Sequence, residues 1–313
     1  MPRIVVTRGL PEPALAVLRE SGADVWVSPE DRALAPAELH DAVRGAEAVV
    51  TMLHDRVDGA FLDAAGDRLR VVANVAVGYD NVDVQAARER GVLVTNTPGV
   101  LTDATADLAI ALLLAVTRRV GEGERLIRSR EPWAWSIDFM LGRGLRGKTL
   151  GIVGFGAIGR AVAARARGFG LEVVYTQRSP GEEPGQVPLD ELLARAHVVS
   201  LHCPLTPETR HLIDADALAR MRDDAYLVNT ARGPVVDEAA LAAALRDGVI
   251  AGAGLDVFER EPEVHPALVA LENVVLIPHL GSATVETRTA MAELAAANVV
   301  AVLAGDAPPT PVG

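Results

Sequence analysis

The chain has 313 residues, half of them apolar, which is enough to build two domains with buried cores. Its formal net charge of −12 argues against a nucleic-acid-binding protein, because such proteins carry a basic surface. Cys203 is the only cysteine, so no internal disulfide can form and we expect a reducing compartment.

The first hundred residues alternate strand-like and helix-like runs, which predicts a parallel sheet with helices packed on it. The first residues, Met1–Thr7, have the pattern of a strand, so we expect no leader peptide there. No uninterrupted apolar run reaches the roughly 20 residues of a membrane span. We therefore expect a soluble cytoplasmic protein with no membrane partner. The predicted elements are strands at 4–7, 24–27, 48–51, 71–75 and 92–96, and a helix at 13–20.

Residues 102–120 predict one long helix, with Thr102 or Asp103 as its N-cap. A stretch rich in Gly, Trp and Arg follows, and a second set of strand and helix units begins at Thr149. Residues 282–303 predict a final helix that returns to the N-terminal module. A boundary that the chain crosses twice forms a hinge with a cleft, which is a usual place for a small ligand.

A glycine-rich turn, Gly154-Phe155-Gly156-Ala157-Ile158-Gly159, separates a strand-like run at 150–153 from a helix-like run at 160–169. The first glycine permits the tight turn, the second lets the backbone approach a pyrophosphate, and the third lets helix and strand pack closely. The N-terminus of the helix then faces the phosphates. A second strand-like run follows at 171–176, so the setting predicts a Rossmann dinucleotide site.

The end of that second strand indicates which dinucleotide binds. An NAD site usually has Asp or Glu there for the ribose 2′-hydroxyl. Here the sequence is Thr176-Gln177-Arg178-Ser179, in which Arg178 and Ser179 can hold a 2′-phosphate. Glu172 lies at the wrong end of the strand, and Glu182 is too far along the loop. We expect NADP as the preferred cofactor and NAD as possible; the alternative is that Arg178 is a solvated loop residue.

Three charged residues, Arg232, Glu261 and His279, each follow a strand-like run. In open parallel sheets, ligands bind beyond the carboxyl ends of the strands. Arginine can bind a carboxylate, and a carboxylate beside histidine favours the imidazolium that donates a proton. With the glycine turn, these residues predict hydride transfer to a small carbonyl acid.

These segments together resemble the D-isomer-specific 2-hydroxyacid dehydrogenases, and within that family the glyoxylate and hydroxypyruvate reductases. The most similar segments are 96–107 and 278–283, and the resemblance covers almost the whole chain. The layout and the resemblance imply two doubly wound parallel-sheet α/β domains with a cleft between them. A flavodoxin-like substrate domain would comprise 1–99 and 286–313, and a Rossmann nucleotide-binding domain would comprise 100–285.

The resemblance also implies roles for the charged residues. Arg232 would hold the carboxylate and carbonyl oxygen of a 2-oxo acid, and His279 would be the general acid. Glu261 would pair with His279, and Asp256 would orient the nicotinamide amide. The implied reaction is NAD(P)H-dependent reduction of glyoxylate or hydroxypyruvate to the D-2-hydroxy acid, with hydride from nicotinamide and the proton from His279.

Further positions match by resemblance alone. Val77 and Gly78 match residues whose backbone N–H groups bind the substrate carboxylate, and Leu53 matches a nearby substrate contact. A homodimer is expected, with residues 102–135 as a candidate interface, and the sequence shows no metal-ligand spacing. The matched cofactor-lining positions are Thr105, Gln177, Pro204, Thr209, Thr230, Ala231 and Gly281.

Several alternatives stay open. Glu259 and Glu263 compete with Glu261, which only the match to Glu-x-Glu-Pro favours. Another D-2-hydroxyacid dehydrogenase, of the D-lactate, phosphoglycerate or phosphonate type, is the second interpretation, although a phosphonate enzyme would have lysine where Val77 stands. A dinucleotide-sensing corepressor is the non-enzymatic alternative. A Trp133 or Trp135 from a partner subunit that reaches the site also stays open.

Overall fold

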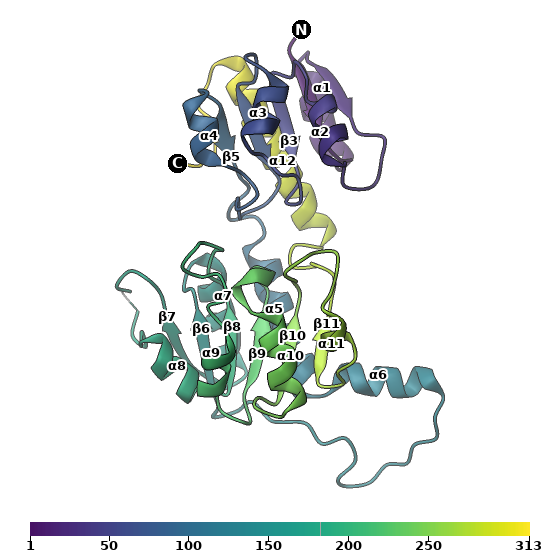
Figure 1. Cartoon of the computed structure of the whole chain (residues 1–313), viewed down its shortest axis with the longest axis vertical. Helices are drawn as coiled ribbons and strands as arrows, with labels where there is room; N and C mark the ends of the chain where they lie inside the picture. The colour runs from purple at the N-terminus through teal and green to yellow at the C-terminus, as the bar shows by residue number, and fades with distance from the viewer. Residues whose placement is uncertain (182) are drawn as a thin grey trace. The chain divides into compact units, whose positions relative to one another are not determined.

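The structure is a computed structural model that describes residues 1–181 and 183–313. The chain divides into two compact units: Met1–Leu101 with Ser282–Gly313, called unit 1 here, and Thr102–Gly281, called unit 2. Each unit contains one parallel β-sheet with helices packed against it (Figure 1). Both units therefore have the doubly wound α/β architecture that the sequence predicts.

The sheet of unit 1 has five parallel strands in the order β2-β1-β3-β4-β5, which is the flavodoxin-like order. Its strands are β1 (Arg3–Val6), β2 (Asp24–Val27), β3 (Ala48–Thr51), β4 (Val71–Asn74) and β5 (Leu93–Thr95). Its helices are α1 (Glu12–Glu20), α2 (Pro36–Ala42), α3 (Gly59–Ala65), α4 (Val84–Glu89) and α12 (Val285–Ala304).

Both faces of this sheet are buried, which explains the near-continuous apolar runs of its strands. Val5 and Val49 pack with Phe61 in a cluster on one face. Their neighbours Ile4 and Val50 belong to a second cluster, because successive side chains of a strand point to opposite faces.

Helix α12 is the one described helix whose length and hydropathy would let it cross a membrane. It packs instead against α1, β3 and β4 of unit 1, and residues such as Ala295 and Val299 are fully buried there. Glu286, Arg288 and Glu293 interrupt its apolar sequence. This is the setting of a core helix.

The sheet of unit 2 has six parallel strands in the order β11-β10-β9-β8-β6-β7. Its strands are β6 (Thr149–Val153), β7 (Glu172–Thr176), β8 (Val198–Leu201), β9 (Tyr226–Asn229), β10 (Gly252–Leu255) and β11 (Val274–Leu276). Its helices are α5 (Thr102–Thr117), α6 (Val120–Ser129), α7 (Ala157–Gly168), α8 (Leu189–Arg195), α9 (Ala215–Arg220), α10 (Glu238–Arg246), α11 (Pro266–Val269) and the 3-10 turn η1 (Gly233–Val235).

The order in which the chain adds strands to this parallel sheet reverses at β6. The chain passes from β6 outward to β7 and then to β8 on the other side of β6. In open α/β sheets this reversal opens a crevice at the carboxyl ends of the two diverging strands. The glycine turn follows β6, so it lies at this switch point.

The predicted long helix at 102–120 is wrong in its last turn. Helix α5 ends at Thr117, and α6 starts at Val120 as a separate helix. Arg119 between them has a left-handed backbone (φ 55°), which interrupts the helical hydrogen bonds. Two other helix starts differ by three residues: α7 begins at Ala157 rather than Arg160, and α12 at Val285 rather than Ser282.

Candidate active site

The glycine turn joins β6 to α7 in unit 2. Gly154 has φ 93°, and a Cβ there would lie 2.5 Å from the backbone N of Cys203. A Cβ on Gly159 would lie 2.3 Å from the oxygen of Gly154. Both glycines are therefore required by the backbone of this turn itself.

Gly156 is different, because neither its conformation nor its packing requires glycine. It is the N-cap of α7 with φ −79°, and nothing lies within 4 Å of a Cβ built on it. The following residues, Ala157 and Ile158, begin the helix. A glycine kept beside open space at a helix N-terminus fits the close approach of a pyrophosphate.

Phe155 is turned into the core. Its ring stacks on Tyr175, with centroids 3.8 Å apart, and only 2% of the residue is exposed. The guanidinium of Arg160 lies over its outer face, 5.1 Å from the centroid. The Phe155 side chain therefore supports the turn from within the core, and only its backbone could contact a ligand.

The loop after β7 carries Gln177, Arg178 and Ser179, and the last two are exposed. One amide holds this loop: Gln186 Nε2 donates to the carbonyl oxygens of Gln177 and Ser179, both at 3.2 Å. Gln186 Oε1 accepts from the N–H of Gly181. The sequence pattern did not indicate Gln186, because a glutamine nine residues along carries no local motif. Glu182 lies outside the described residues.

Arg232 lies just beyond β9 in a turn that asparagine closes. Asn229 Oδ1 accepts from the N–H of Ala231, and Asn229 Nδ2 donates to the carbonyl of Arg232, both at 3.0 Å. A Cβ on Gly233 would lie 1.9 Å from the carbonyl carbon of Phe258. The Arg232 turn therefore packs directly on the segment that leads to Glu261.

Glu261 and His279 are in direct contact. Glu261 Oε2 lies 2.8 Å from His279 Nδ1, and Glu261 Oε1 accepts from the N–H of Phe258 at 3.0 Å. Both side chains are about one quarter exposed. The carboxylate fixes the ring through Nδ1, which leaves Nε2 as the nitrogen that can face a reacting group.

The pKa of the Glu261 carboxyl is lowered from its usual value. Burial acts in the opposite direction, but the hydrogen bond and positive charge of His279, the N–H of Phe258 and the charge of Arg232 outweigh it. Glu261 is therefore a stable anion beside the imidazole at neutral pH. Arg232, Glu261 and His279 thus lie in one electrostatic neighbourhood of unit 2.

Asp256 holds the turn that carries His279. Its two carboxylate oxygens accept from the N–H groups of Leu280 and Gly281, and its carbonyl accepts from the N–H of His279 at 2.8 Å. Burial raises the pKa of the Asp256 carboxyl. His279 has φ 52°, an unfavourable value for a non-glycine residue, and these three bonds hold it there. Any contact of Asp256 with nicotinamide would use its remaining lone pairs.

Glu259 and Glu263 do not take the place of Glu261. Glu259 Oε1 lies 3.1 Å from His211 Nε2 and also accepts from the N–H of Glu238, while the N–H of Glu259 donates to Glu238 Oε1. Glu263 lines a cavity of about 430 Å³ that Glu259, His211 and Glu238 also line. Among the three glutamates of this loop, Glu261 is thus the one bonded to His279.

The remaining positions predicted to line the cofactor lie in the first turn of α5 or in loops that follow strands of unit 2. Thr105, in α5, lies 3.5 Å from a Cβ built on Gly281. Thr209 Oγ1 donates to the carbonyl of Pro204 at 2.7 Å, and Thr230 Oγ1 lies 3.4 Å from His202 Nδ1. Burial raises the pKa of the Cys203 thiol to about 11, which makes it a poor nucleophile.

The predicted substrate contacts Leu53, Val77 and Gly78 belong to unit 1. Leu53 is exposed in the loop after β3, and Val77 and Gly78 are half-buried in the loop after β4. Among the described residues, no group of three or more His, Cys, Asp or Glu side chains is arranged to hold a metal ion.

Comparisons with known proteins agree with the fold. The family model described as D-isomer specific 2-hydroxyacid dehydrogenase, NAD binding domain, matches residues 110–281. A glyoxylate reductase of Thermococcus gammatolerans is 50% identical over 99% of this chain and 95% of its own length. A glyoxylate reductase of Pyrococcus furiosus is 49% identical over 99% of this chain and 94% of its own.

Solved structures are also similar along the whole chain, and two of them serve as examples. The TT0316 protein of Thermus thermophilus superposes with a TM-score of 0.94 at 51% identity, over 99% of this chain and 100% of that one. An NADPH-dependent glyoxylate/hydroxypyruvate reductase of Sinorhizobium meliloti, in complex with NADP and malonate, has a TM-score of 0.86 at 37% identity, over 100% and 97%.

The fold and the strand-end residues define a nicotinamide-dinucleotide-dependent oxidoreductase. The chain belongs to the D-isomer specific 2-hydroxyacid dehydrogenase family, which confirms the resemblance drawn from its sequence.

Proposed function

We propose that this enzyme reduces glyoxylate or hydroxypyruvate to the D-2-hydroxy acid with a reduced nicotinamide cofactor. The contact between Glu261 and His279, beside Arg232 in unit 2, carries the proposal. The relatives named glyoxylate reductase at about half identity support this choice of substrate over the D-lactate, phosphoglycerate and phosphonate alternatives.

In the proposed reaction, Arg232 binds the substrate's carboxylate and carbonyl oxygen and so fixes which face of the carbonyl reacts. His279 donates its Nε2 proton to the carbonyl oxygen as negative charge develops there. Glu261 stabilises the protonated imidazole before this transfer and orients the ring. The bound dinucleotide supplies the hydride.

The cofactor is proposed to be NADP in preference to NAD. The exposed Arg178 and Ser179 stand where an NAD enzyme would place an acidic residue after β7. Gln186 holds their loop through its backbone carbonyls, and none of its hydrogen bonds within the described residues uses either side chain. Both side chains are therefore available to a 2′-phosphate. The similar Sinorhizobium reductase is NADPH-dependent and was solved with NADP bound, which is consistent with this choice.

We assign substrate-domain and nucleotide-binding roles to the two units. Unit 2 would bind the dinucleotide, since it contains the glycine turn and the loop after β7. Unit 1 would contribute Leu53 and the backbone N–H groups of Val77 and Gly78 to substrate binding. The substrate-domain and nucleotide-binding roles would thus divide between residues 101 and 102 and between residues 281 and 282.

A homodimer is proposed from the exposed apolar side chains of α6 and of the segment after it. Helix α6 has no buried residue, and it projects with that segment from the body of unit 2 (Figure 1). Trp135 is 75% exposed and Ile137 is 82% exposed. Large apolar side chains exposed together along one segment normally mark a contact with another chain.

The configuration of the product tests the proposed reaction, and the mass of the protein in solution tests the proposed dimer. Hydroxypyruvate and NADPH should yield D-glycerate, identified by chiral chromatography, while L-glycerate would contradict the family mechanism. Light scattering should give twice the 32.9 kDa chain mass. A Trp135→Asp, Ile137→Asp variant should elute as a monomer, whereas a wild-type monomer would remove the dimer proposal.

A further inference from the structure

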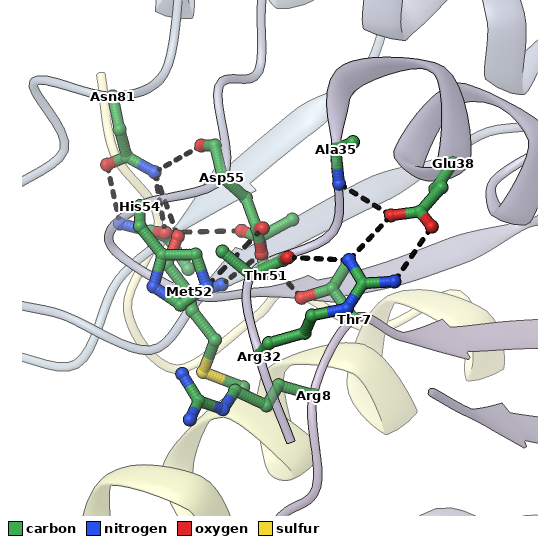
Figure 2. A network of polar contacts seen from close by, with 12 residues as sticks. Thr7, Arg8, Arg32, Ala35, Glu38, Thr51, Met52, His54, Asp55 and Asn81 are labelled. Atoms are coloured by element: carbon green, nitrogen blue, oxygen red, sulfur yellow. Dashed lines mark hydrogen bonds and ion pairs between the residues drawn. The ribbon is translucent and has the colours of Figure 1, made fainter. Parts of the chain in front are cut away.

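Two loops of unit 1, at 52–58 after β3 and at 75–82 after β4, are joined by a network of side-chain amides. Figure 2 shows Asn81 turned toward the loop that contains Met52 and Asp55. The first loop carries Leu53 and the second carries Val77 and Gly78, the three residues assigned to the substrate.

The centre of this network is a reciprocal pair of side-chain amides. Asn74 Nδ2 lies 3.2 Å from Asn81 Oδ1, and Asn81 Nδ2 lies 3.1 Å from Asn74 Oδ1. Asn74 is fully buried at the end of β4, and Thr51 at the end of β3 also donates to its Oδ1. Because a buried amide is costly unless it is hydrogen-bonded, this pair fixes both side chains.

Each amide also bonds to the backbone of a loop. Asn74 Nδ2 donates to the carbonyl of Gly78 at 3.1 Å. Asn81 Nδ2 donates to the carbonyls of Asp55 and Met52, at 2.9 and 3.2 Å. The amide pair therefore connects the Gly78 loop to the Leu53 loop.

A third asparagine acts on the neighbouring peptide. Asn96, just after β5, donates from Nδ2 to the carbonyl of Val77 at 2.8 Å. The carbonyls of Val77 and Gly78 thus each accept a hydrogen bond from an asparagine side chain. Among the hydrogen bonds of the described residues, none uses the N–H of Val77 or Gly78. Successive unused N–H groups on a fixed backbone form an anion-binding nest.

Asp55 fixes the far loop in the same way. Its carboxylate is 2% exposed and accepts from the N–H of Met52 at 2.8 Å and from the hydroxyl of Thr7. This closes the turn that presents Leu53, while the backbone contact from Val57 N–H to the carbonyl of Asn81, at 2.9 Å, ties the loops together further along.

We propose that Asn74, Asn81 and Asn96 are positioning residues for substrate binding. Asn96 and Asn74 hold the carbonyls of Val77 and Gly78, and Asn81 fixes the Asn74 amide, so that the N–H groups of Val77 and Gly78 bind the carboxylate of a 2-oxo acid. The inference rests on the proposed function of Val77 and Gly78. Asn96 acts on the nest alone. Asn81 also sets the distance from the nest to Leu53, so it influences which acid side chain is accepted.

The direct test compares Asn96→Ala with Asn273→Ala. Asn273 is a half-buried control whose amide likewise donates to two backbone carbonyls, those of Leu245 and Ala251, but in unit 2. Asn96→Ala should raise KM for glyoxylate by about tenfold, the effect of about one hydrogen bond, with kcat within about threefold. The Kd for NADPH should be unchanged, and Asn273→Ala should leave KM unchanged. An unchanged KM in Asn96→Ala, or an equal rise in the control, would overturn the inference.

Asn81→Ala separates positioning from general loosening. It should change the hydroxypyruvate-to-glyoxylate ratio of kcat/KM by about threefold or more, because it releases the Leu53 loop. Asn96→Ala should raise KM for both acids equally and keep that ratio. If the two variants shift the ratio alike, Asn81 has no separate role and the proposed link between the loops is wrong.

Hydrogen exchange of the folded protein tests the nest without relying on turnover or on a variant that folds poorly. Oxalate, which carries a carboxylate like the substrate's, should slow amide exchange in the peptide that covers residues 75–81. If the wild type reduces glyoxylate but oxalate leaves this exchange unchanged, the nest is wrong and the proposed function stands. If the wild type reduces no 2-oxo acid but oxalate still protects the peptide, the proposed function fails and the nest stands.

Discussion

His279 Nδ1 lies 2.8 Å from Glu261 Oε2, and His279 itself has the left-handed backbone angle φ 52°. The two facts are connected, because Asp256 accepts three backbone N–H groups from the turn that holds the ring against Glu261. The Glu261–His279 pair is therefore preorganised within unit 2, beyond the carboxyl ends of β10 and β11.

Replacing His279 with alanine should remove general acid catalysis and little else. We expect kcat to fall by about 10²–10⁴-fold, with the Kd for NADPH unchanged, because the cofactor turn lies on other strands. His211→Ala is the matched control, since His211 also pairs with a glutamate of the same loop. Steady-state kinetics and cofactor fluorescence measure both quantities. Equal losses in the two variants would show that the effect is structural.

Glu261→Gln should make the stability of the folded protein less dependent on pH in the acidic range. The pKa of Glu261 is lowered in the folded protein, so its contribution to stability is complete above the ordinary glutamate value of about 4.3. That contribution is lost as pH falls through the lower folded value. The Tm difference between wild type and variant should therefore be largest near pH 7 and shrink below about pH 4. A difference that stays constant with pH would contradict this view of the pair.

Gly156→Ala should weaken cofactor binding without unfolding the protein. A Cβ at this position meets no protein atom within 4 Å, so the Tm should change little. The added methyl would occupy the space assigned to the pyrophosphate, and we expect the Kd for NADPH to rise about tenfold or more. Gly233→Ala gives the contrast, because its Cβ would lie 1.9 Å from Phe258 and should prevent folding. Unchanged NADPH affinity in Gly156→Ala would place the phosphates elsewhere.

Cofactor preference should reverse when the loop after β7 is changed. In a variant with Thr176→Asp, Arg178→Ala and Ser179→Ala, a carboxylate replaces the proposed 2′-phosphate contacts. Because each charge-assisted bond contributes about 1.5–3 kcal/mol, the NADPH-to-NADH ratio of kcat/KM should fall by at least about tenfold. Arg195→Ala removes another surface arginine of unit 2, paired with Glu191, and should leave the ratio alone. A ratio that stays put in the triple variant would refute the assignment of Arg178.

Much of the fold, and the pairing of Glu261 with His279, could be predicted because each signal is local. Strand β3 spans the predicted residues 48–51, and the glycine turn and the Pro-His-Leu-Gly segment are each contiguous in sequence. The break between α5 and α6 could not be predicted, since Arg119 adopts its left-handed angle without a glycine or proline beside it to signal the change. Gln186 and the Asn74–Asn81 pair were missed for another reason: their hydrogen-bond partners stand at no fixed spacing along the chain, and a lone amide has no periodicity.

The most direct test of the proposed reaction is the initial rate of reduced-nicotinamide oxidation by the wild-type enzyme, with His279→Ala as the blank. NADPH and NADH would each be paired with glyoxylate, hydroxypyruvate and pyruvate. We predict that glyoxylate or hydroxypyruvate with NADPH gives the highest kcat/KM and that the blank is nearly inactive. Tight NADPH binding with no oxidation by any of the acids would contradict the proposed reaction, and would favour a protein that senses the dinucleotide rather than one that uses it.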